Sequence, residues 1–209
     1  MLNIAYHPIY QLPLPEGHRF PMEKYDLLPK QLLYEGTCEK EDFFAPEKIP
    51  NAIIESVHDS KYLDRLLNLA LDPKEVRKIG FPLSQQLIDR EIIIAGGTVE
   101  GAKRALTDGI AMNIAGGTHH AFSAWGEAFC LLNDQAIAAQ YLIDQQLVNR
   151  VLIVDLDVHQ GNGTAEIFKH NPAVFTFSMH GAKNYPFHKE ESDYDLAMED
   201  GTNDTTYLN

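Results

Sequence analysis

The sequence predicts an α/β protein built on an open, mainly parallel sheet with helices on both faces. Residues 151–154 form an uninterrupted apolar run, which is typical of a strand buried on both faces of a parallel sheet. A helical stretch and a second apolar strand over 174–178 complete a strand–helix–strand unit, the repeating unit of open α/β sheets. The length of 209 residues fits a single domain, which we place over residues 1–209.

The first half of the chain predicts one short strand, over residues 2–6, and two helices. Asp59 is the expected N-cap of the first helix, and Pro73 is expected to end it. Its apolar positions recur at helical spacing and are Tyr62, Leu63, Leu66, Leu67 and Ala70. The second helix is expected over 84–106, where glycines lower helix propensity and indicate close packing against a neighbour. These glycines are Gly96, Gly97 and Gly101.

The second half of the chain alternates strands with helices. The expected order is strand 111–115, helix 133–145, strand 151–157, helix 164–169 and strand 174–178. The stretch 188–204 is acidic and polar, so we expect it to be a surface loop. Tyr207 and Leu208 resemble the start of a further element.

Composition excludes several classes of protein. The chain has 17 Lys and Arg against 30 Asp and Glu, a formal net charge of −13, which disfavours direct nucleic-acid binding. No apolar run reaches the roughly 18–20 residues of a membrane span, and residues 1–10 lack the pattern of a secretory signal. Cys38 and Cys130 are too few for a disulfide framework or a thiolate zinc site. We therefore expect a cytoplasmic protein without a membrane partner.

Two of the predicted strands end in residues that bind metals or carry protons. The strand over 111–115 leads into GGTHHAF, which contains His119 and His120. The next strand leads into DLDVHQGNGT, where Asp155, Asp157 and His159 alternate and so share one side of an extended backbone. Because ligands collect at the carboxyl ends of strands in open α/β sheets, we expect both loops to contribute to one site.

A carboxylate and an imidazole two residues apart suit a divalent cation such as zinc, which binds oxygen and nitrogen ligands. Asp157 and His159 are the candidate ligands. Asp155 is then free to orient a histidine, because a carboxylate bonded to an imidazole fixes its tautomer and stabilises its charged form. His119 and His120 are the candidate partners of Asp155.

Each of these residues also has an ordinary structural interpretation. An aspartate at a strand end is commonly a turn former or a cap, and Asn133 suits a helix N-cap. Cys130 suits a small buried side chain. A competing enzyme hypothesis is a phosphatase-type hydrolase, since Asp155 and Asp157 after an apolar strand also suit a nucleophilic aspartate with magnesium. That hypothesis leaves the paired histidines unexplained.

The motifs GGTHHAF, AFCLLND, VLIVDLDVHQGNGT and FTFSMH, in this order and spacing, resemble the zinc-dependent histone deacetylase family. The segments PLPEGHRFPMEKY and HQGNGT are similar to its class IV branch and bacterial relatives. The resemblance runs from Ala5 to Leu208. It implies an arginase-like α/β fold and removal of an acetyl group from the acetyl-lysine of a protein or from a related small acetylamide.

The resemblance also implies a role for each residue of the two loops. Asp157 and His159 match two zinc ligands, and His119 and His120 match the tandem catalytic histidines. Asp155 matches the carboxylate that supports the first of these histidines.

Further matches extend beyond the two loops. Asn162 stands where many members of the family have an aspartate behind the second histidine. Phe129, Tyr185 and Pro186 match the walls of the tunnel that receives the acyl-lysine chain. A structural potassium site is implied at Ser178 and the backbone carbonyls of Asp155, Asp157 and His159.

Two features of the family have no counterpart in these 209 residues. The third zinc ligand, an aspartate, and the tyrosine that stabilises the oxyanion both lie further downstream in the family. Ala128 also replaces a glycine that is usual before the tunnel phenylalanine. We therefore expect a deacetylase-like domain without the C-terminal part of the family's domain. The alternative is a truncated, non-catalytic binding module of the same fold; the oligomeric state stays open.

Overall fold

The computed structural model describes residues 2–208 and confirms the α/β class. Within this range, all strand pairs are parallel and form two three-stranded sheets, ordered β2-β1-β3 and β4-β5-β6. The strands are β1 (Ile4–Ala5), β2 (Phe43–Phe44), β3 (Met112–Asn113), β4 (Val151–Asp155), β5 (Val174–Gly181) and β6 (Tyr194–Met198). The sequence predicted one sheet, whereas no described residues of β3 and β4 pair with each other.

Helices separate these strands along the chain. The α-helices are α1 (Lys24–Tyr34), α2 (Asn51–Ile54), α3 (Ser60–Leu67), α4 (Pro73–Ile79), α5 (Gln85–Asp108), α6 (Asp134–Asp144), α7 (Asn162–Phe168) and α8 (Asp204–Leu208). Two short 3₁₀ helices are η1 (Pro8–Tyr10) and η2 (Lys40–Asp42). Nowhere in residues 2–208 is there a helix with the length and apolar character needed to cross a membrane.

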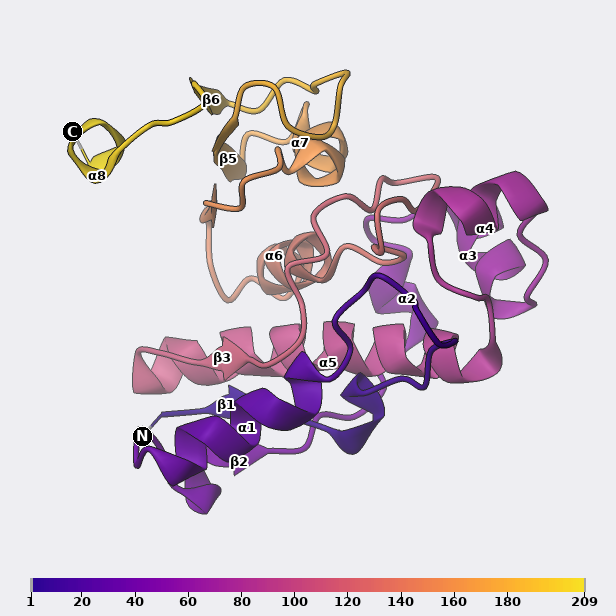
Figure 1. The fold of residues 1–209 in the computed structure, drawn as a ribbon, viewed down its shortest axis with the longest axis vertical. Coiled ribbons are helices and arrows are strands. Elements are labelled where there is room, and N and C mark those ends of the chain that lie inside the picture. The colour runs from indigo at the N-terminus through magenta and orange to yellow at the C-terminus, as the bar shows by residue number, and fades with distance from the viewer. Residues whose placement is uncertain (1, 209) are drawn as a thin grey trace.

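The two sheets lie at opposite ends of the molecule in Figure 1, with α6 between them and α5 alongside β3. The larger hydrophobic core surrounds α5, and a smaller one joins α6 to the β4–α7–β5 unit. The smaller core consists of Ala136, Ala139, Ile153, Phe168 and Val174. Because this cluster fixes β4 against α6, it holds the end of β4 near the loop that precedes α6.

The long helix α5 begins next to Ser84, as the sequence predicts, and extends two residues beyond the predicted end at residue 106. The Ser84 hydroxyl accepts a hydrogen bond from the N–H of Leu87, and Gly109 ends the helix in the left-handed conformation. A Cβ atom at Gly96 would overlap the carbonyl oxygen of Glu47. The glycine therefore permits close packing, as predicted.

The N-caps of α3 and α6 are also confirmed. The Asp59 carboxylate accepts from the N–H groups of Lys61 and Tyr62, and Asn133 accepts from Ala136. The prediction that Pro73 ends this helix was wrong: α3 ends at Leu67, and Pro73 occupies the first turn of α4, where a missing N–H costs nothing.

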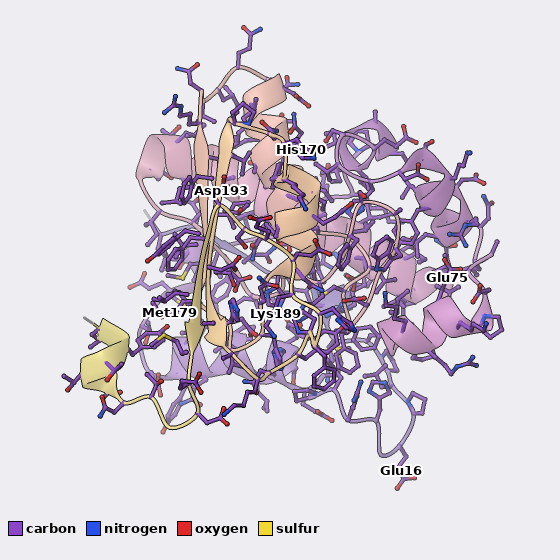
Figure 2. All side chains as sticks on the ribbon, turned by 90° about the horizontal axis from the view of Figure 1, so that it is seen from above. Glu16, Glu75, His170, Met179, Lys189 and Asp193 are labelled. Atoms are coloured by element: carbon purple, nitrogen blue, oxygen red, sulfur yellow. The ribbon has the colours of Figure 1, made fainter. Side chains whose placement is uncertain are left out.

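Strand β4 is not buried on both faces, which corrects the sequence prediction. Ile153 and Asp155 are buried, but Leu152 and Val154 are 61% and 53% exposed. The same alternation continues in β5, and Figure 2 shows Met179 on the side of the sheet away from α7. The β4–β5–β6 sheet therefore has one covered face and one open apolar face.

The stretch 188–204 is not only a surface loop. It contains β6, which pairs with β5 over Phe177–Gly181 despite its acidic neighbours. The expected element at Tyr207 and Leu208 is present as α8.

Candidate active site

The two histidines and the residues after β4 come together in the structure. His119 Nδ1 lies 2.6 Å from Asp155 Oδ2, and His120 Nδ1 lies 2.6 Å from Asn162 Oδ1. The two imidazole rings are adjacent, with centroids 4.0 Å apart. Both histidines are buried. Two loops that are distant along the chain therefore form one cluster of polar side chains.

Backbone packing fixes the loop that carries the histidines. Gly163, in the first turn of α7, lies so close to the carbonyl of Ala121 that a Cβ atom there would overlap it. The N–H of Thr164 donates to the carbonyl of His119 at 3.2 Å. On the other side, Thr118 donates through its N–H and its hydroxyl to Asp134 at the start of α6. These contacts fix the direction in which the paired imidazoles point.

Asp157 and His159 lie beside the paired histidines. His159 Nδ1 is 2.9 Å from Asp157 Oδ1, and His119 Nε2 is 4.0 Å from the same oxygen. Burial alone would raise the pKa of Asp157, but the N–H of His159 and the neighbouring imidazoles outweigh it and hold the pKa below its usual range. The carboxylate is therefore ionised and able to bind a cation.

The donor chemistry of Asp157 and His159 fits zinc, because it combines a carboxylate oxygen with an imidazole nitrogen. A catalytic zinc site takes three protein ligands. Among residues 2–208, no group of three His, Cys, Asp or Glu side chains is arranged to hold a metal ion. The described chain thus supplies two adjacent donors and needs a further one to complete such a site.

A cavity of about 610 Å³ opens over this cluster. Its lining includes both paired histidines, Asp157, His159, Phe129 and Tyr185. Pro186 follows Tyr185 through a cis peptide bond but does not line the cavity. Ser178 lies behind the site, where its buried hydroxyl is 3.0 Å from His180 Nδ1. The volume is in the range of small-molecule sites.

The surroundings of His120 change its pKa. Burial, reinforced by the neighbouring His119, lowers its pKa from 6.5 to about 4. The imidazole is therefore neutral near pH 7 and has one nitrogen able to accept a proton. Such a group in a cavity is suited to proton transfer.

Several residues of the cavity lining could not be assigned to the site from sequence spacing. The segment 12–21 and its continuation contribute Arg19, Phe20 and Lys24 to the cavity lining, and α5 contributes Arg90. The Phe20 and Phe129 rings lie 5.0 Å apart, so the N-terminal segment completes one wall. No spacing in the sequence connects residue 20 with residue 129.

Glu127 was also missed. It is a buried carboxylate that contacts Asn162, Tyr185 and Lys78. The only signal in the sequence is its place two residues before Phe129, within the GEAFC segment. Cys130 is a buried side chain, as the sequence predicts, and this burial raises the pKa of its thiol.

Comparison with known proteins gives a family match over most of the chain. Residues 18–209 match the model of the histone deacetylase domain. An uncharacterized protein of Picosynechococcus sp. is 47% identical over 98% of this chain and 68% of its own length. Histone deacetylase 2 of Arabidopsis thaliana is 28% identical over 89% of this chain and 50% of its own length.

A solved structure shows the same fold. The crystal structure of an HDAC homolog from Aquifex aeolicus aligns with a TM-score of 0.81 and 22% identity. The alignment covers 99% of this chain and 62% of that one. The chain thus spans between half and about two thirds of the length of these relatives.

Proposed function

The chain belongs to the histone deacetylase family, and from this premise we propose that it builds the site of a zinc-dependent deacetylase. The substrate is an N-acetyl-lysine side chain or a related small acetylamide, and the reaction is hydrolysis of the amide bond. The observation that carries the proposal is the pair His119 and His120 on the cavity wall, held by Asp155 and Asn162.

His120 acts as the general base and then as the general acid. Its Nδ1 is engaged by Asn162, so Nε2 is the nitrogen that takes a proton from the attacking water. The same nitrogen then returns the proton to the leaving amine. The first transfer needs a neutral imidazole, which burial provides, and the second uses the proton that the first has placed on Nε2.

His119 supports this chemistry through its charge and position. Asp155 accepts a hydrogen bond from His119 Nδ1 and stabilises the imidazole when it is protonated. The ring of His119 lies against that of His120 and beside Asp157, so it orients the reacting groups.

Asp157 and His159 would hold the zinc ion, and a further ligand would complete the site. When bound, the metal supplies Lewis-acid activation of the amide carbonyl and of water. We also propose that Ser178 and the backbone carbonyls of Asp155, Asp157 and His159 hold a structural potassium ion.

Aromatic side chains select the substrate. Phe129 and Tyr185 line the cavity, and the Tyr185 ring stands edge-on to His120 with centroids 5.1 Å apart. An apolar wall of this kind suits the alkyl chain of an acylated lysine, whose charge the acetyl group removes.

The test is release of acetate from an N-acetyl-lysine peptide by the chain supplied with Zn²⁺. We expect His120→Ala to lower the rate by about 100-fold or more, the contribution of general acid–base catalysis. Asp157→Ala should lower the zinc content of the purified protein. A wild-type protein that neither binds the peptide nor releases acetate contradicts the proposal.

A binding module of the same fold is the second candidate. It is favoured because no group of three His, Cys, Asp or Glu side chains among residues 2–208 is arranged to hold a metal ion. Calorimetric binding of the acetyl-lysine peptide, or of a hydroxamate probe, without release of acetate would support it over the enzyme.

A further inference from the structure

Glu127 is a buried carboxylate that the proposed chemistry does not use. Only 4% of the residue is exposed. Its Oε1 accepts hydrogen bonds from Asn162 Nδ2 at 2.9 Å and from the Tyr185 hydroxyl at 2.7 Å. Its Oε2 forms an ion pair with Lys78 Nζ at 2.5 Å. All three partners donate to Glu127, which is the pattern expected of an ionised carboxylate.

Lys78 and the other donors keep Glu127 ionised. Burial on its own would raise the pKa of Glu127, but the bonds from Lys78, Tyr185 and Asn162 outweigh it and hold the pKa below its usual value. An ionised carboxylate accepts hydrogen bonds and cannot donate one. Glu127 can therefore bind only the NH₂ end of the Asn162 amide.

This restriction determines which tautomer His120 adopts. With Nδ2 directed to Glu127, the Asn162 amide presents Oδ1 to His120. Because that oxygen only accepts, His120 Nδ1 must carry the hydrogen. The second ring nitrogen, Nε2, is then unprotonated. An asparagine without such an anchor could turn its amide over and favour the opposite tautomer.

We propose that Glu127 is a positioning residue that fixes His120 in its Nδ1-protonated tautomer by orienting the Asn162 amide. The proposal rests on the proposed role of His120 as the base. The Glu127 carboxylate acts on His120 through Asn162. The neutral Asn162 amide contacts the imidazole, and the ionised Glu127 carboxylate sets the direction of both hydrogen bonds of that amide. Tyr185 on the cavity wall donates to the same Glu127 oxygen as Asn162 does. Glu127 therefore connects the wall of the cavity with His120, the proposed base.

The experiment is ¹⁵N–¹H correlation NMR of the histidine rings in the metal-free 209-residue chain at pH 7, with the His120 signals assigned by loss in His120→Gln. In the wild type we expect His120 to be protonated at Nδ1. In Glu127→Gln the charge is lost, and the Nε2-protonated population should rise roughly tenfold, the scale set by one charge-assisted hydrogen bond.

The matched control is Glu166→Gln. The Glu166 carboxylate accepts from the N–H and hydroxyl of Ser123, in the loop that follows the paired histidines, and it has no hydrogen bond to the Asn162 side chain. This variant should leave the His120 tautomer unchanged. If Glu127→Gln fails to fold, Lys78→Met removes the cation that keeps Glu127 ionised and should shift the tautomer in the same direction. An unchanged tautomer in a folded Glu127→Gln or Lys78→Met protein overturns the proposal.

A kinetic cycle separates positioning from general structural support. In zinc-supplied protein, Glu127→Gln should lower kcat roughly tenfold with little change in KM. In Asn162→Asp, His120 faces a carboxylate, which accepts through either oxygen and so needs no orientation by Glu127. Adding Glu127→Gln to the Asn162→Asp variant should therefore no longer lower kcat. A loss of kcat in both backgrounds contradicts the positioning role. If no variant releases acetate, the proposed function fails while the NMR result still decides the role of Glu127.

Discussion

Ala128 and Phe129 adopt a backbone conformation that side chains disfavour. Their φ angles are +47° and +68°, in the left-handed region. The loop is held there by hydrogen bonds from both N–H groups to the carbonyls of Lys78 and Ile79. These bonds place the Phe129 ring on the cavity wall, so the site is assembled at the cost of local backbone strain.

Replacing Ala128 with glycine should relieve that strain. We expect Ala128→Gly to raise the free energy of unfolding by about 1 kcal/mol, since glycine adopts positive φ without a steric penalty. Chemical denaturation measures the change. Ala105→Gly in α5 is the control and should lower stability by about 1 kcal/mol. Equal losses in the two variants would contradict the account of Ala128.

The residues of the site differ in how far the sequence reveals them. The paired histidines and the Asp155–His159 run carry donor atoms at short, regular spacings, so their chemistry is visible locally. Glu127 and Arg19 act through contacts with segments that are far away in the chain. Their roles depend on tertiary packing, which no local spacing encodes.

At the scale of elements, His58 connects three segments. Its Nδ1–H donates to the carbonyl of Phe122 at 3.0 Å, and its Nε2 accepts from the N–H of Asn133 at 2.9 Å. The residue follows α2, while its partners belong to the histidine loop and to the N-cap of α6. Only 3% of the residue is exposed, and burial lowers the pKa of the imidazole to about 4. The neutral imidazole of His58 therefore uses both of its ring nitrogens in hydrogen bonds.

This arrangement predicts a loss of stability in acid. The unfolded chain binds a proton on His58 near pH 6.5, whereas the folded chain resists protonation until about pH 4. Stability from this group is therefore complete above pH 6.5 and decreases as the pH falls to 4, by about 3 kcal/mol in all. Denaturation at a series of pH values measures it. His58→Gln should be less stable at pH 7 and should have a shallower slope over this interval; an unchanged slope would contradict the assignment.

The elements that the sequence predicts well carry both periodicity and a cap. The helices α3, α5 and α6 each follow a capping side chain, at Asp59, Ser84 and Asn133. The helix α1 has no side-chain cap and was not predicted. Strand β6 was missed because acidic and polar residues surround it, and its strand character comes from pairing with β5.

At the scale of the whole molecule, the β4–β5–β6 sheet presents an open apolar face. Leu152, Val154, Phe175 and Tyr194 are all exposed there, and the Phe177 and Tyr194 rings stack across β5 and β6. Contiguous apolar surface of this kind marks an interaction surface or an aggregation hazard. This open face also explains why the prediction that β4 is buried on both faces was wrong. An apolar run indicates a strand, but it does not indicate whether other elements cover both faces of that strand.

The open face should make the 209-residue chain bind apolar dyes and associate as its concentration rises. We expect Leu152→Thr combined with Phe175→Thr to reduce dye fluorescence and light scattering, while each substitution changes stability by about 0.5 kcal/mol or less. Ile153→Thr, on the covered face of the same strand, is the matched control and should cost about 2 kcal/mol or more without reducing association. If the paired surface substitutions destabilise the chain as much as Ile153→Thr, that face is covered in solution and the sheet has no open side.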